Sequence, residues 1–572
     1  MSASTINAGD GDAGAEGGRL AGHAIVDALR LHGVDMVFGV PGESYLAVID
    51  GLHDANDIRT IMCRQEGGAA MMAEAYGKLT GKPGVCMVTR GPGATNASAG
   101  VHIGFQDSTP MVILIGQVAR HMVDREAFQE IDYRRMYGQM AKWVAQIDDA
   151  ERIPEYLSRA FHTATSGRPG PVVLALPEDM LRDTITAPAL EPYQRVEAHP
   201  GPGDMDRLRT MMADAESPLL ILGGGGWDAE ACERVKGFAE TSGVPVACSF
   251  RCQDYFDNRH PNYVGHVGIG IDPALGKRIA ESDLLVVVGA RMGEMTTGGY
   301  DMLEIPRPKQ GFVHIHSGSD ELGRVYQGDL LINAGPRAFA EALGRLEPLD
   351  GSKWKASVEA GHAAYLETLK PEPIPGDVQM GEICAWLNET LPEDAIITNG
   401  AGNYAGWMHR YWQYKMYRSG LSPTSGSMGY GLPSAVAAKL VHPDRMVVSM
   451  NGDGCFMMHG QELATAIQNG ANIIAIIINN GLYGTIRMHQ ERHYPGRIRN
   501  TELINPDFAA LAKAYGGHGE TVTRTDEFKA AFERAQASGR PAVIEVRIDP
   551  NAITPTTTLS AIREASLAKA GR

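Results

Sequence analysis

Short runs of Val, Ile and Leu alternate with longer amphipathic stretches along almost the whole chain. Predicted strands of a first block lie at 36–40, 85–89, 111–115 and 172–175. The predicted strands of a second block lie at 219–223, 244–247, 284–288 and 313–316. The predicted strands of a third block lie at 395–398, 446–450, 473–478 and 543–547. Apolar strands separated by amphipathic helices are typical of doubly wound parallel sheets. The sequence therefore predicts an α/β protein with three such sheets.

Two stretches without a clear period separate the blocks. Residues 183–203 carry several prolines, and residues 347–376 end in the proline-rich KPEPIPG after a short helical patch. We therefore expect domains at 19–185, 204–346 and 377–550, each of ordinary domain size. Residues 1–18, rich in Gly, Ala, Ser and Asp, are expected to form a disordered tail, and residues 551–572 a C-terminal tail.

Composition excludes several classes of function. At 572 residues the chain is too long for one core, and its 44% hydrophobic and 21% charged residues are typical of a soluble globular protein. A formal net charge of −16 disfavours binding to nucleic acid or to an anionic membrane. No apolar run is long enough to span a bilayer. The seven cysteines lack metal-ligand spacing, so we expect reduced, buried thiols in a cytoplasmic protein.

Polar residues at the ends of two predicted strands are the strongest candidates for chemistry. Asp453 stands between two glycines after the run at 446–450, and Asn480 follows the run at 473–478. Both should lie at the carboxyl ends of neighbouring parallel strands, where open α/β sheets bind ligands. A carboxylate and an amide oxygen suit a hard divalent cation that takes further oxygens from a diphosphate and water. Asp-Gly alone is a common turn, so the pairing with Asn480 carries the prediction.

Other motifs have a structural and a functional interpretation. Glu66 begins an Ala- and Met-rich helix, where it interacts with the helix dipole or serves as a buried acid with a shifted pKa; the residues alone favour the dipole. The loops at 40–43 and 89–96 are turns or points where the backbone approaches a ligand. Gly223–Gly226 is a turn or a phosphate-binding helix start. Met428 is by default a core residue.

Taken together, these motifs resemble the thiamine diphosphate enzymes of the acetolactate synthase superfamily. The resemblance extends from about Arg19 to Ile548 and rests on GDG-CFMM-xx-QELATA followed by NNGLYG, and on GSMGYGLPSA, GPGATN, DSTPMV, AFQE and GRPGPV-x-LALPEDM. It implies a pyrimidine-binding, a central and a diphosphate-binding domain, in the order of the three blocks.

The resemblance also implies roles for individual residues. Asp453, Asn480 and the main-chain oxygen of Leu482 would bind Mg²⁺, and Glu66 would hydrogen-bond N1′ of the aminopyrimidine. Residues expected around the rest of the cofactor are Pro41, Gly42, Asn96, Gly426, Met428, Gly452, Gly454, Cys455, Tyr483 and Gly484. Among these, Met428 would be the wedge that bends thiamine diphosphate, and the Gly426 carbonyl would orient its 4′-amino group.

Assembly follows from the same resemblance. Glu66 and Asp453 lie in different domains, and in this family such residues meet across a subunit interface. A homodimer or homotetramer with active sites at that interface is therefore expected. A small regulatory subunit is a further candidate partner.

The chain departs from the family pattern at three places. The common His-Glu-Gln run at the acid is Gln65-Glu66-Gly67. Arg90 replaces a small residue or His before Gly-Pro-Gly. There it either forms an ion pair with a nearby Glu or Asp or binds a substrate carboxylate with two parallel hydrogen bonds. The acidic pair that accompanies flavin in the central domain is replaced by 314–317, His-Ile-His-Ser. FAD, an ADP-type ligand and an empty site all stay open.

The expected activity is that of a thiamine diphosphate- and Mg²⁺-dependent 2-oxo acid lyase/carboligase. Pyruvate or a similar 2-oxo acid would lose CO₂ and be joined to a second carbonyl compound, which Gln129 and Arg90 would help to place. Phe128-Gln129-Glu130 resembles the carboligating members. The alternatives are simple decarboxylation and cleavage of a 1,2-diketone or a 2-hydroxyacyl thioester. Glu66, Asp453, Asn480 and Met428 together argue against a non-catalytic nucleotide-binding paralogue.

Overall fold

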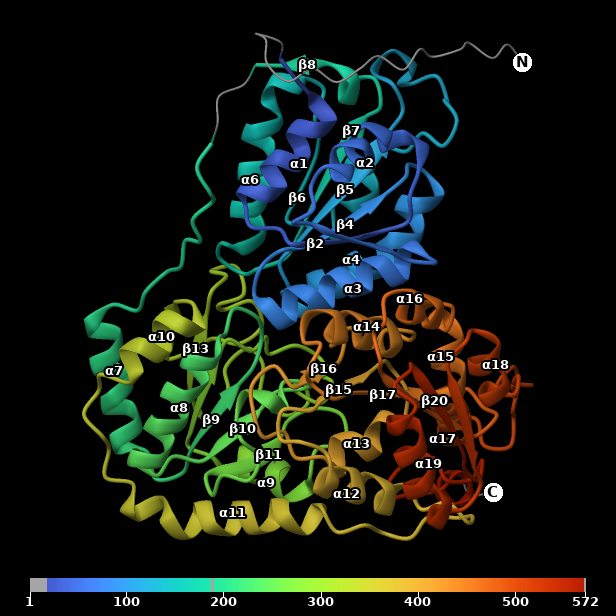
Figure 1. Cartoon of the computed structure of the whole chain (residues 1–572). Coiled ribbons are helices and arrows are strands. Elements are labelled where there is room, and N and C mark those ends of the chain that lie inside the picture. The colour runs from blue at the N-terminus through green and yellow to red at the C-terminus, as the bar shows by residue number, and fades with distance from the viewer. Residues whose placement is uncertain (1–17, 187–189, 570–572) are drawn as a thin grey trace.

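The computed structural model describes residues 18–186 and 190–569, which form three bodies built around parallel sheets (Figure 1). Each body has one six-stranded sheet flanked by helices, which confirms the predicted architecture. In Figure 1 the N-terminal body stands above the other two, which lie side by side. The tail expected over 1–18 lies outside the described residues, apart from Gly18.

The N-terminal sheet has the order β3-β2-β4-β5-β7-β6, and each neighbouring pair is parallel. Its strands are β2 (Met36–Gly39), β3 (Arg59–Met62), β4 (Gly84–Val88), β5 (Met111–Gln117), β6 (Trp143–Gln146) and β7 (Pro171–Pro177). One face carries α1 (Ala21–Leu31), α2 (Leu46–His53) and α6 (Ile153–Thr165), and the other carries α3 (Glu66–Thr80), α4 (Pro92–Asp107) and α5 (Tyr133–Tyr137). An antiparallel ribbon of β1 (Arg19–Leu20) and β8 (Thr184–Ile185) joins its two ends.

The central sheet has the order β11-β10-β9-β12-β13-β14. Its strands are β9 (Pro218–Leu222), β10 (Val246–Cys248), β11 (Tyr263–His266), β12 (Leu284–Val288), β13 (Gly311–His316) and β14 (Leu330–Asn333). The helices are α7 (Pro202–Asp214), α8 (Ala229–Ser242), α9 (Pro273–Glu281), α10 (Pro336–Leu343) and α11 (Lys355–Thr368). Helix α11 lies where the second linker was expected, and it packs on β11 with His362 Nδ1 2.8 Å from the Tyr263 oxygen.

The C-terminal sheet has the order β16-β15-β17-β18-β20-β19. Its strands are β15 (Ile396–Asn399), β16 (Gly420–Leu421), β17 (Val447–Gly452), β18 (Ile474–Asn479), β19 (His518–Val522) and β20 (Ala542–Arg547). Helices α12 (Met380–Thr390), α13 (Ala405–Tyr411) and α19 (Thr525–Ala537) cover one face, and α14 (Gly431–Val441), α15 (Asp453–His459), α16 (Glu462–Gln468) and α18 (Phe508–Ala514) cover the other. Helices α17 (Gly484–His493) and α20 (Leu559–Lys569) pack against each other at the end of the sheet.

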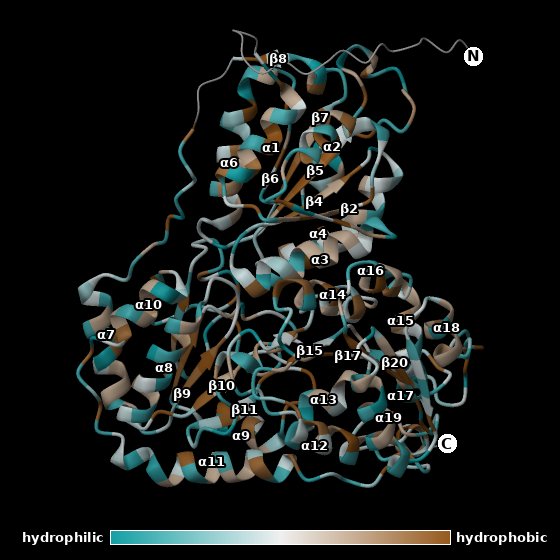
Figure 2. Ribbon diagram, viewed as in Figure 1, coloured by the Kyte–Doolittle hydropathy of each residue, from teal (hydrophilic) through white to brown (hydrophobic). Residues whose placement is uncertain are grey.

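One hydrophobic core runs from the N-terminal sheet into the C-terminal sheet. Helix α3 packs against α14, and their apolar side chains belong to a single buried cluster. Helix α3 also packs closely on α4, where a Cβ atom on Gly100 would lie 2.5 Å from the Cβ of Ala70. Figure 2 shows hydrophobic residues concentrated in the strands. The ends of the two sheets are therefore held at fixed relative positions.

The described chain has no helix that is both long and apolar enough to cross a membrane. All seven cysteines are free and buried, as the sequence predicted.

A buried carboxylate on α17 holds the C-terminal helix α20 against it. The side chain of Glu491 is 0% exposed, and it accepts hydrogen bonds from Arg563 Nε (2.8 Å), Arg487 Nε (3.1 Å) and the Gly496 amide (3.0 Å). The hydrogen bond from Arg563 is the main cause that lowers the pKa of Glu491 from 4.5 to about 2.

We expect Glu491→Gln to loosen α20. Because the pKa of Glu491 is depressed in the folded state, the stabilisation is present above about pH 4.5 and is lost as the pH falls toward 2. Amide hydrogen exchange of α20 should be faster in the variant at pH 7, and the difference from wild type should shrink only below about pH 4.5. Glu533→Gln, an exposed change on α19, should leave α20 unaffected. Equal exchange in wild type and Glu491→Gln at pH 7 would refute the role of Glu491 in holding α20 against α17.

Candidate functional site

Asp453 and Asn480 lie at the ends of two neighbouring strands in the middle of the C-terminal sheet. Strands β17 and β18 are parallel, with Gly452 opposite Ile478. Asp453 begins α15 directly after β17, and Asn480 directly follows β18. The structure therefore places both residues at the carboxyl edge of the sheet, where ligands of this fold class bind.

The carboxylate of Asp453 is buried among neutral donors. The residue is 3% exposed, and it accepts from the amides of Gly454 (2.8 Å) and Gly481 (2.9 Å) and from Asn505 Nδ2 (2.8 Å). No Lys, Arg or His of the described residues lies within 4.0 Å, and burial raises the pKa of Asp453. A buried carboxylate without a cation is destabilising, so this site favours a bound positive ion.

The donors around Asp453 fit a hard cation. Asn480 Oδ1 lies at the same edge and accepts from the Leu482 amide at 3.2 Å, and the Leu482 carbonyl adds a main-chain oxygen. Within 18–186 and 190–569, no three His, Cys, Asp or Glu side chains gather as a metal-binding group. A cation at Asp453 would therefore depend on amide, main-chain and non-protein oxygens, which is the coordination that Mg²⁺ adopts with phosphates.

The glycines on either side of Asp453 let two tyrosine rings pack directly against the backbone. A Cβ atom on Gly452 would lie 2.7 Å from the ring of Tyr404, and one on Gly454 would lie 2.6 Å from the ring of Tyr483. Cys455 Sγ accepts from Tyr404 Oη and from the Gly429 amide, each at 3.1 Å. These contacts tie the segment after β17 to the residue that follows Met428. The structure thus brings the expected diphosphate-binding residues together.

Glu66 is the first residue of α3 and is half-buried. Gln65 caps this helix, accepting from the Gly67 amide at 2.5 Å and the Gly68 amide at 3.1 Å. The Glu66 carboxylate accepts from Asn96 Nδ2 at 3.0 Å, so two residues expected at the cofactor are in contact. Because Gln65 provides the cap, the Glu66 carboxylate is free for other chemistry.

In the described part of one chain, the two halves of the expected site do not meet at the large cavity. A cavity of about 1230 Å³ lies between the three domains, and of the expected site residues only Gly426 lines it. No hydrogen bond joins Glu66 to Asp453 or Asn480 in the described chain. The link between these regions is indirect, with Gln65 Oε1 3.2 Å from His459 Nε2 at the far end of α15.

Sequence reasoning missed a buried ionic cluster between the N- and C-terminal domains. Lys78 Nζ contacts Asp107, and Asp107 accepts from the Thr424 amide at 2.9 Å. Glu74, which is 0% exposed, accepts from Tyr430 Oη at 2.6 Å. The only signal in the sequence was a Glu–Lys pair four positions apart in an otherwise apolar helix. The cluster fixes the loop that carries Gly426.

Arg90 is paired with acidic side chains, which is one of the two alternatives expected for it. Its Nη1 lies 3.0 Å from Glu178 and its Nη2 3.2 Å from Glu43, and its Nε donates to the Phe128 carbonyl at 3.2 Å. All three nitrogens are engaged, so Arg90 holds the residue next to Gln129. Gln129 itself has a φ of 67° and packs against Gly91.

We expect Arg90→Ser to lower the free energy of unfolding by about 1–3 kcal/mol, because it leaves Glu178 unpaired. Acceptor preference should change no more than it does in Gln129→Asn, since Arg90 would act through that neighbour. Denaturant unfolding and competition between two acceptors measure the two effects. Arg135→Ser, a change at a side chain that is 90% exposed, is the control and should alter neither. A switch in acceptor preference with unchanged stability would favour direct carboxylate recognition.

The edge of the central sheet fits a nucleotide only in part. Gly224 has a φ of 73°, and a Cβ there would lie 1.8 Å from the Gly289 oxygen, so only glycine fits where these two turns meet. At the end of β13, His316 Nδ1 accepts from the Gly318 amide at 3.0 Å, and burial lowers the pKa of His316 to about 4. A neutral imidazole thus stands where the family resemblance led us to expect an acidic side chain.

Comparisons with known proteins cover almost the whole chain. Three family models match: the N-terminal TPP binding domain of thiamine pyrophosphate enzymes over residues 19–136, the central domain over 205–343 and the C-terminal TPP binding domain over 400–546. The chain is 34% identical to the acetolactate synthase large subunit of Corynebacterium glutamicum, over 92% of this chain and 87% of that protein. It is 32% identical to the acetolactate synthase isozyme 2 large subunit of Escherichia coli, over 92% and 95% of the two chains.

Proposed function

Because this chain belongs to the acetolactate synthase family of thiamine diphosphate-dependent enzymes, we propose that it is a Mg²⁺-dependent 2-oxo acid carboligase. It would release CO₂ from pyruvate or a similar 2-oxo acid and join the remaining fragment to a second carbonyl compound. The observation that carries this proposal is the buried Asp453 carboxylate, which has no cationic partner within 4.0 Å among the described residues and lies between two glycines at the same sheet edge as Asn480.

The C-terminal domain would hold the charged end of the cofactor. Asp453, Asn480 and the Leu482 carbonyl would bind Mg²⁺. The segment 452–455 would cradle the diphosphate, with Tyr483 and Gly484 beside it. Burial removes water from these groups and so strengthens their attraction for the cation. When bound, thiamine diphosphate supplies the carbon nucleophile and the electron sink that loss of CO₂ requires.

The N-terminal domain would supply the acid. Glu66 would hold a proton at N1′ of the aminopyrimidine, and the 3.0 Å hydrogen bond from Asn96 would fix the carboxylate for that contact. Pro41 and Gly42 would flank the ring, as the family resemblance implies. Met428 would pack between the two cofactor rings, and Gly426 would present its carbonyl to the 4′-amino group.

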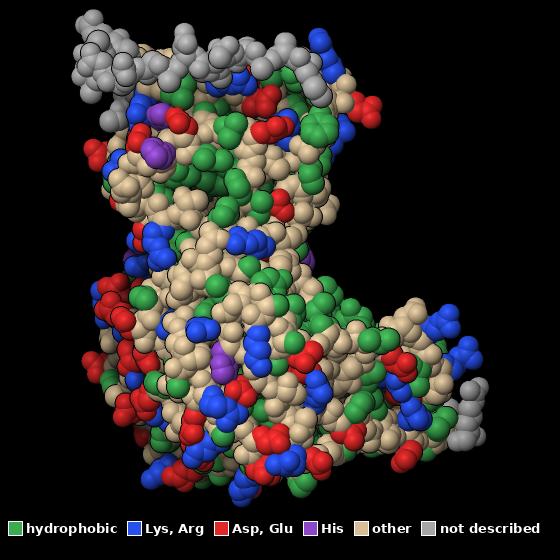
Figure 3. All heavy atoms as spheres, turned by 45° about the vertical axis from the view of Figure 1, so that its right-hand side comes forward, with side chains coloured by type: hydrophobic (Ala, Val, Ile, Leu, Met, Phe, Trp, Pro, Cys, Tyr) green, Lys and Arg blue, Asp and Glu red, His purple; other side chains and the backbone are tan. Residues whose placement is uncertain are grey.

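A homodimer or homotetramer would bring the two halves together. Large apolar side chains are exposed on the C-terminal domain, among them Met457 (50%), Ile486 (55%) and Tyr494 (66%). Figure 3 shows hydrophobic side chains gathered on the shoulder beneath the N-terminal domain. Such a surface is typical of a subunit interface. Because the relatives from C. glutamicum and E. coli are named large subunits, a small regulatory subunit is a further proposed partner.

Product analysis tests the proposed reaction. The purified protein is incubated with thiamine diphosphate, Mg²⁺ and single 2-oxo acids, and then with pairs of a 2-oxo acid and an aldehyde. We expect a coupled 2-hydroxy ketone or acetolactate-type product that requires both cofactors. Release of the aldehyde alone would favour simple decarboxylation, and no turnover of any pair would refute the proposal. The visible absorbance of the same preparation decides whether FAD is bound.

A further inference from the structure

Two charged side chains of the N-terminal domain hold the loop that precedes Gly426. Lys78 Nζ, in α3, donates to the Ser422 carbonyl at 3.0 Å. Asp107, the last residue of α4, accepts from the Thr424 amide at 2.9 Å and also from the Thr424 hydroxyl. Lys78 and Asp107 contact each other as well. Because Lys78 and Asp107 both bind main-chain groups, they fix the backbone of the loop.

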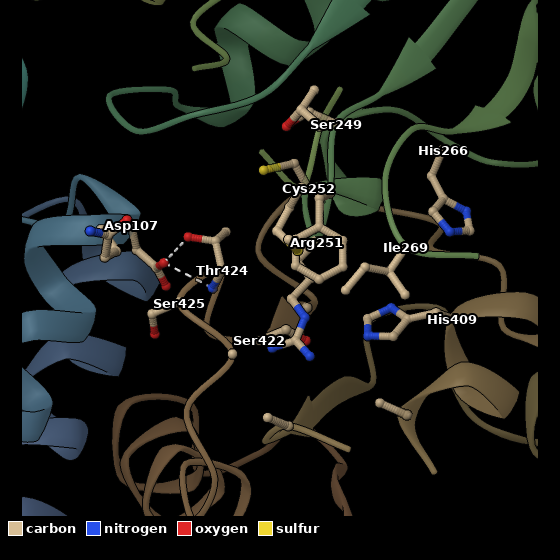
Figure 4. Close-up of a pocket in the computed structure, with 18 of the residues that line it drawn as sticks. Asp107, Ser249, Arg251, Cys252, His266, Ile269, His409, Ser422, Thr424 and Ser425 are labelled. Atoms are coloured by element: carbon tan, nitrogen blue, oxygen red, sulfur yellow. Dashed lines mark hydrogen bonds between the residues drawn. The ribbon is translucent and has the colours of Figure 1, made fainter. Parts of the chain in front are cut away.

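The central domain holds the same loop from another side. Arg251 Nη1 donates to the Pro423 carbonyl. Figure 4 shows Asp107 with its two hydrogen bonds to Thr424 on one side of the loop and Arg251 on the other. Three successive residues, 422–424, are therefore each bonded to a charged side chain of another domain. Loops are ordinarily among the more mobile parts of a protein, so this degree of support calls for a reason.

Burial makes the contacts of the N-terminal domain rigid. The side chain of Asp107 is 1% exposed, and that of Glu74, which lies 3.3 Å from Lys78 Nζ, is 0% exposed. Glu74 accepts from Tyr430 Oη at 2.6 Å, so α3 also holds the far end of the segment that contains Gly426. Removing one partner from such a cluster leaves a buried charge uncompensated. The segment 422–430 is therefore held at both ends by helices of the same chain.

Gly426 takes its position from this support. Its amide donates to the Pro423 carbonyl at 3.1 Å, which closes a turn, and its φ is 67°. A Cβ atom on Gly426 would meet nothing within 4 Å, and the residue lines the large cavity. A residue that borders open space in this way is positioned mainly by the residues before it. The direction of the Gly426 carbonyl therefore depends on the contacts made at 422–424.

Resting on the proposed function above, we propose that Asp107 and Lys78 are positioning residues that orient the Gly426 carbonyl toward the 4′-amino group of thiamine diphosphate. The carbonyl would fix the amino nitrogen that exchanges a proton with C2 of the thiazolium ring. A misplacement of about 1 Å in a reacting geometry can cost about 100-fold in rate. Asp107 and Lys78 would thus control the proton transfer without touching cofactor or substrate.

Proton exchange at the bound cofactor tests this role without any substrate. The enzyme loaded with thiamine diphosphate and Mg²⁺ is diluted into D₂O and quenched in acid, and NMR gives the rate at which the C2 hydrogen is replaced by deuterium. We expect Asp107→Asn to slow this exchange about 10- to 100-fold. The Kd for thiamine diphosphate, from calorimetric titration, should change much less, because the proposed Mg²⁺ site at Asp453 holds the other end of the cofactor.

Tyr76→Phe is the matched control. Tyr76 lies on the same helix as Lys78, is 4% exposed and donates to Asp35 at 2.6 Å, so the change removes a hydrogen bond from α3 but none from the loop. Denaturant unfolding should show a loss of stability in both Tyr76→Phe and Asp107→Asn, whereas C2 exchange should slow in Asp107→Asn alone. Thr424→Val removes one of the two bonds to Asp107 and should slow exchange by a smaller factor. It replaces Asp107→Asn if that protein does not fold.

Three results would overturn the proposal. Wild-type exchange in Asp107→Asn, or equal slowing in Tyr76→Phe, would mean that the cluster only stabilises the fold. Slower exchange with a Kd raised by the same factor would mean that Asp107 serves cofactor affinity. Exchange in the wild type no faster than in free thiamine diphosphate would refute this proposal and the proposed function together. Slower exchange in Asp107→Asn, in an enzyme that turns over no substrate pair, would refute the proposed function alone and leave the positioning role standing.

Discussion

Glu66→Gln is expected to lower turnover by about 10²- to 10⁴-fold, the usual contribution of a positioned acid–base group. Glutamine keeps the size of the side chain and a hydrogen-bonding oxygen for Asn96, but it cannot exchange a proton with N1′ of the aminopyrimidine. The affinity for thiamine diphosphate should therefore change much less than kcat. Steady-state kinetics at saturating cofactor, together with calorimetric titration of thiamine diphosphate, separate these two effects.

Glu155→Gln is the matched control for this change. Glu155 lies in the same domain, is 59% exposed and pairs with Arg152 at the surface, so its substitution should leave turnover and cofactor affinity unchanged. Full activity of Glu66→Gln would refute the assignment of the acid. Loss of folding in Glu66→Gln is not expected, because Gln65 rather than Glu66 provides the helix cap.

Asp453→Asn should abolish the stabilisation of the protein by thiamine diphosphate and Mg²⁺. Without cofactors, the variant should be close to wild type in stability, because removal of a buried charge is offset by an amide NH2 that cannot accept the hydrogen bonds of the oxygen it replaces. With both ligands at 100 to 1,000 times their Kd, wild type gains about 2.7–4.1 kcal/mol, and the variant should gain almost nothing. Activity should fall by more than about 100-fold, because loss of even an indirect metal contact costs up to that much.

Thermal unfolding with and without the two cofactors measures this prediction. Asp526→Asn is the control, because Asp526 lies in the same domain, is 73% exposed and pairs with Arg524. A variant that is destabilised without cofactors but still gains stability from them would contradict the role of Asp453. It would instead indicate that the Asp453 carboxylate only stabilises the turn at 453–454.

The sequence predicted the inner strands of every sheet and missed the outer ones. In each sheet the four predicted strands are the four central strands, and the two that were not predicted are the edges: β3 and β6, β11 and β14, and β16 and β19. Central strands are covered on both faces and appear as continuous apolar runs. The edge strand β14 places alternate side chains in solvent, β3 buries only one of its four residues, and β16 has only two residues. Their pattern does not differ clearly from that of a loop.

The sequence likewise predicted only some residues of the candidate site. Asp453 and Asn480 could be predicted because both follow apolar runs, so the strand pattern fixes their place at the sheet edge. The partners of Arg90 and the Lys78–Asp107 contact could not, because they join residues far apart in the sequence.

The central claim is that Glu66 of one subunit completes the cofactor site anchored by Asp453 of another. Co-expression of Glu66→Gln and Asp453→Asn chains, with purification of the mixed oligomer, tests this claim most directly. In the purified mixed dimer, one of the two shared sites would have both wild-type residues, so it should recover roughly half of wild-type activity. If each site were built within one chain, every site would carry one substitution. Activity no higher than that of the separate variants would then contradict the account.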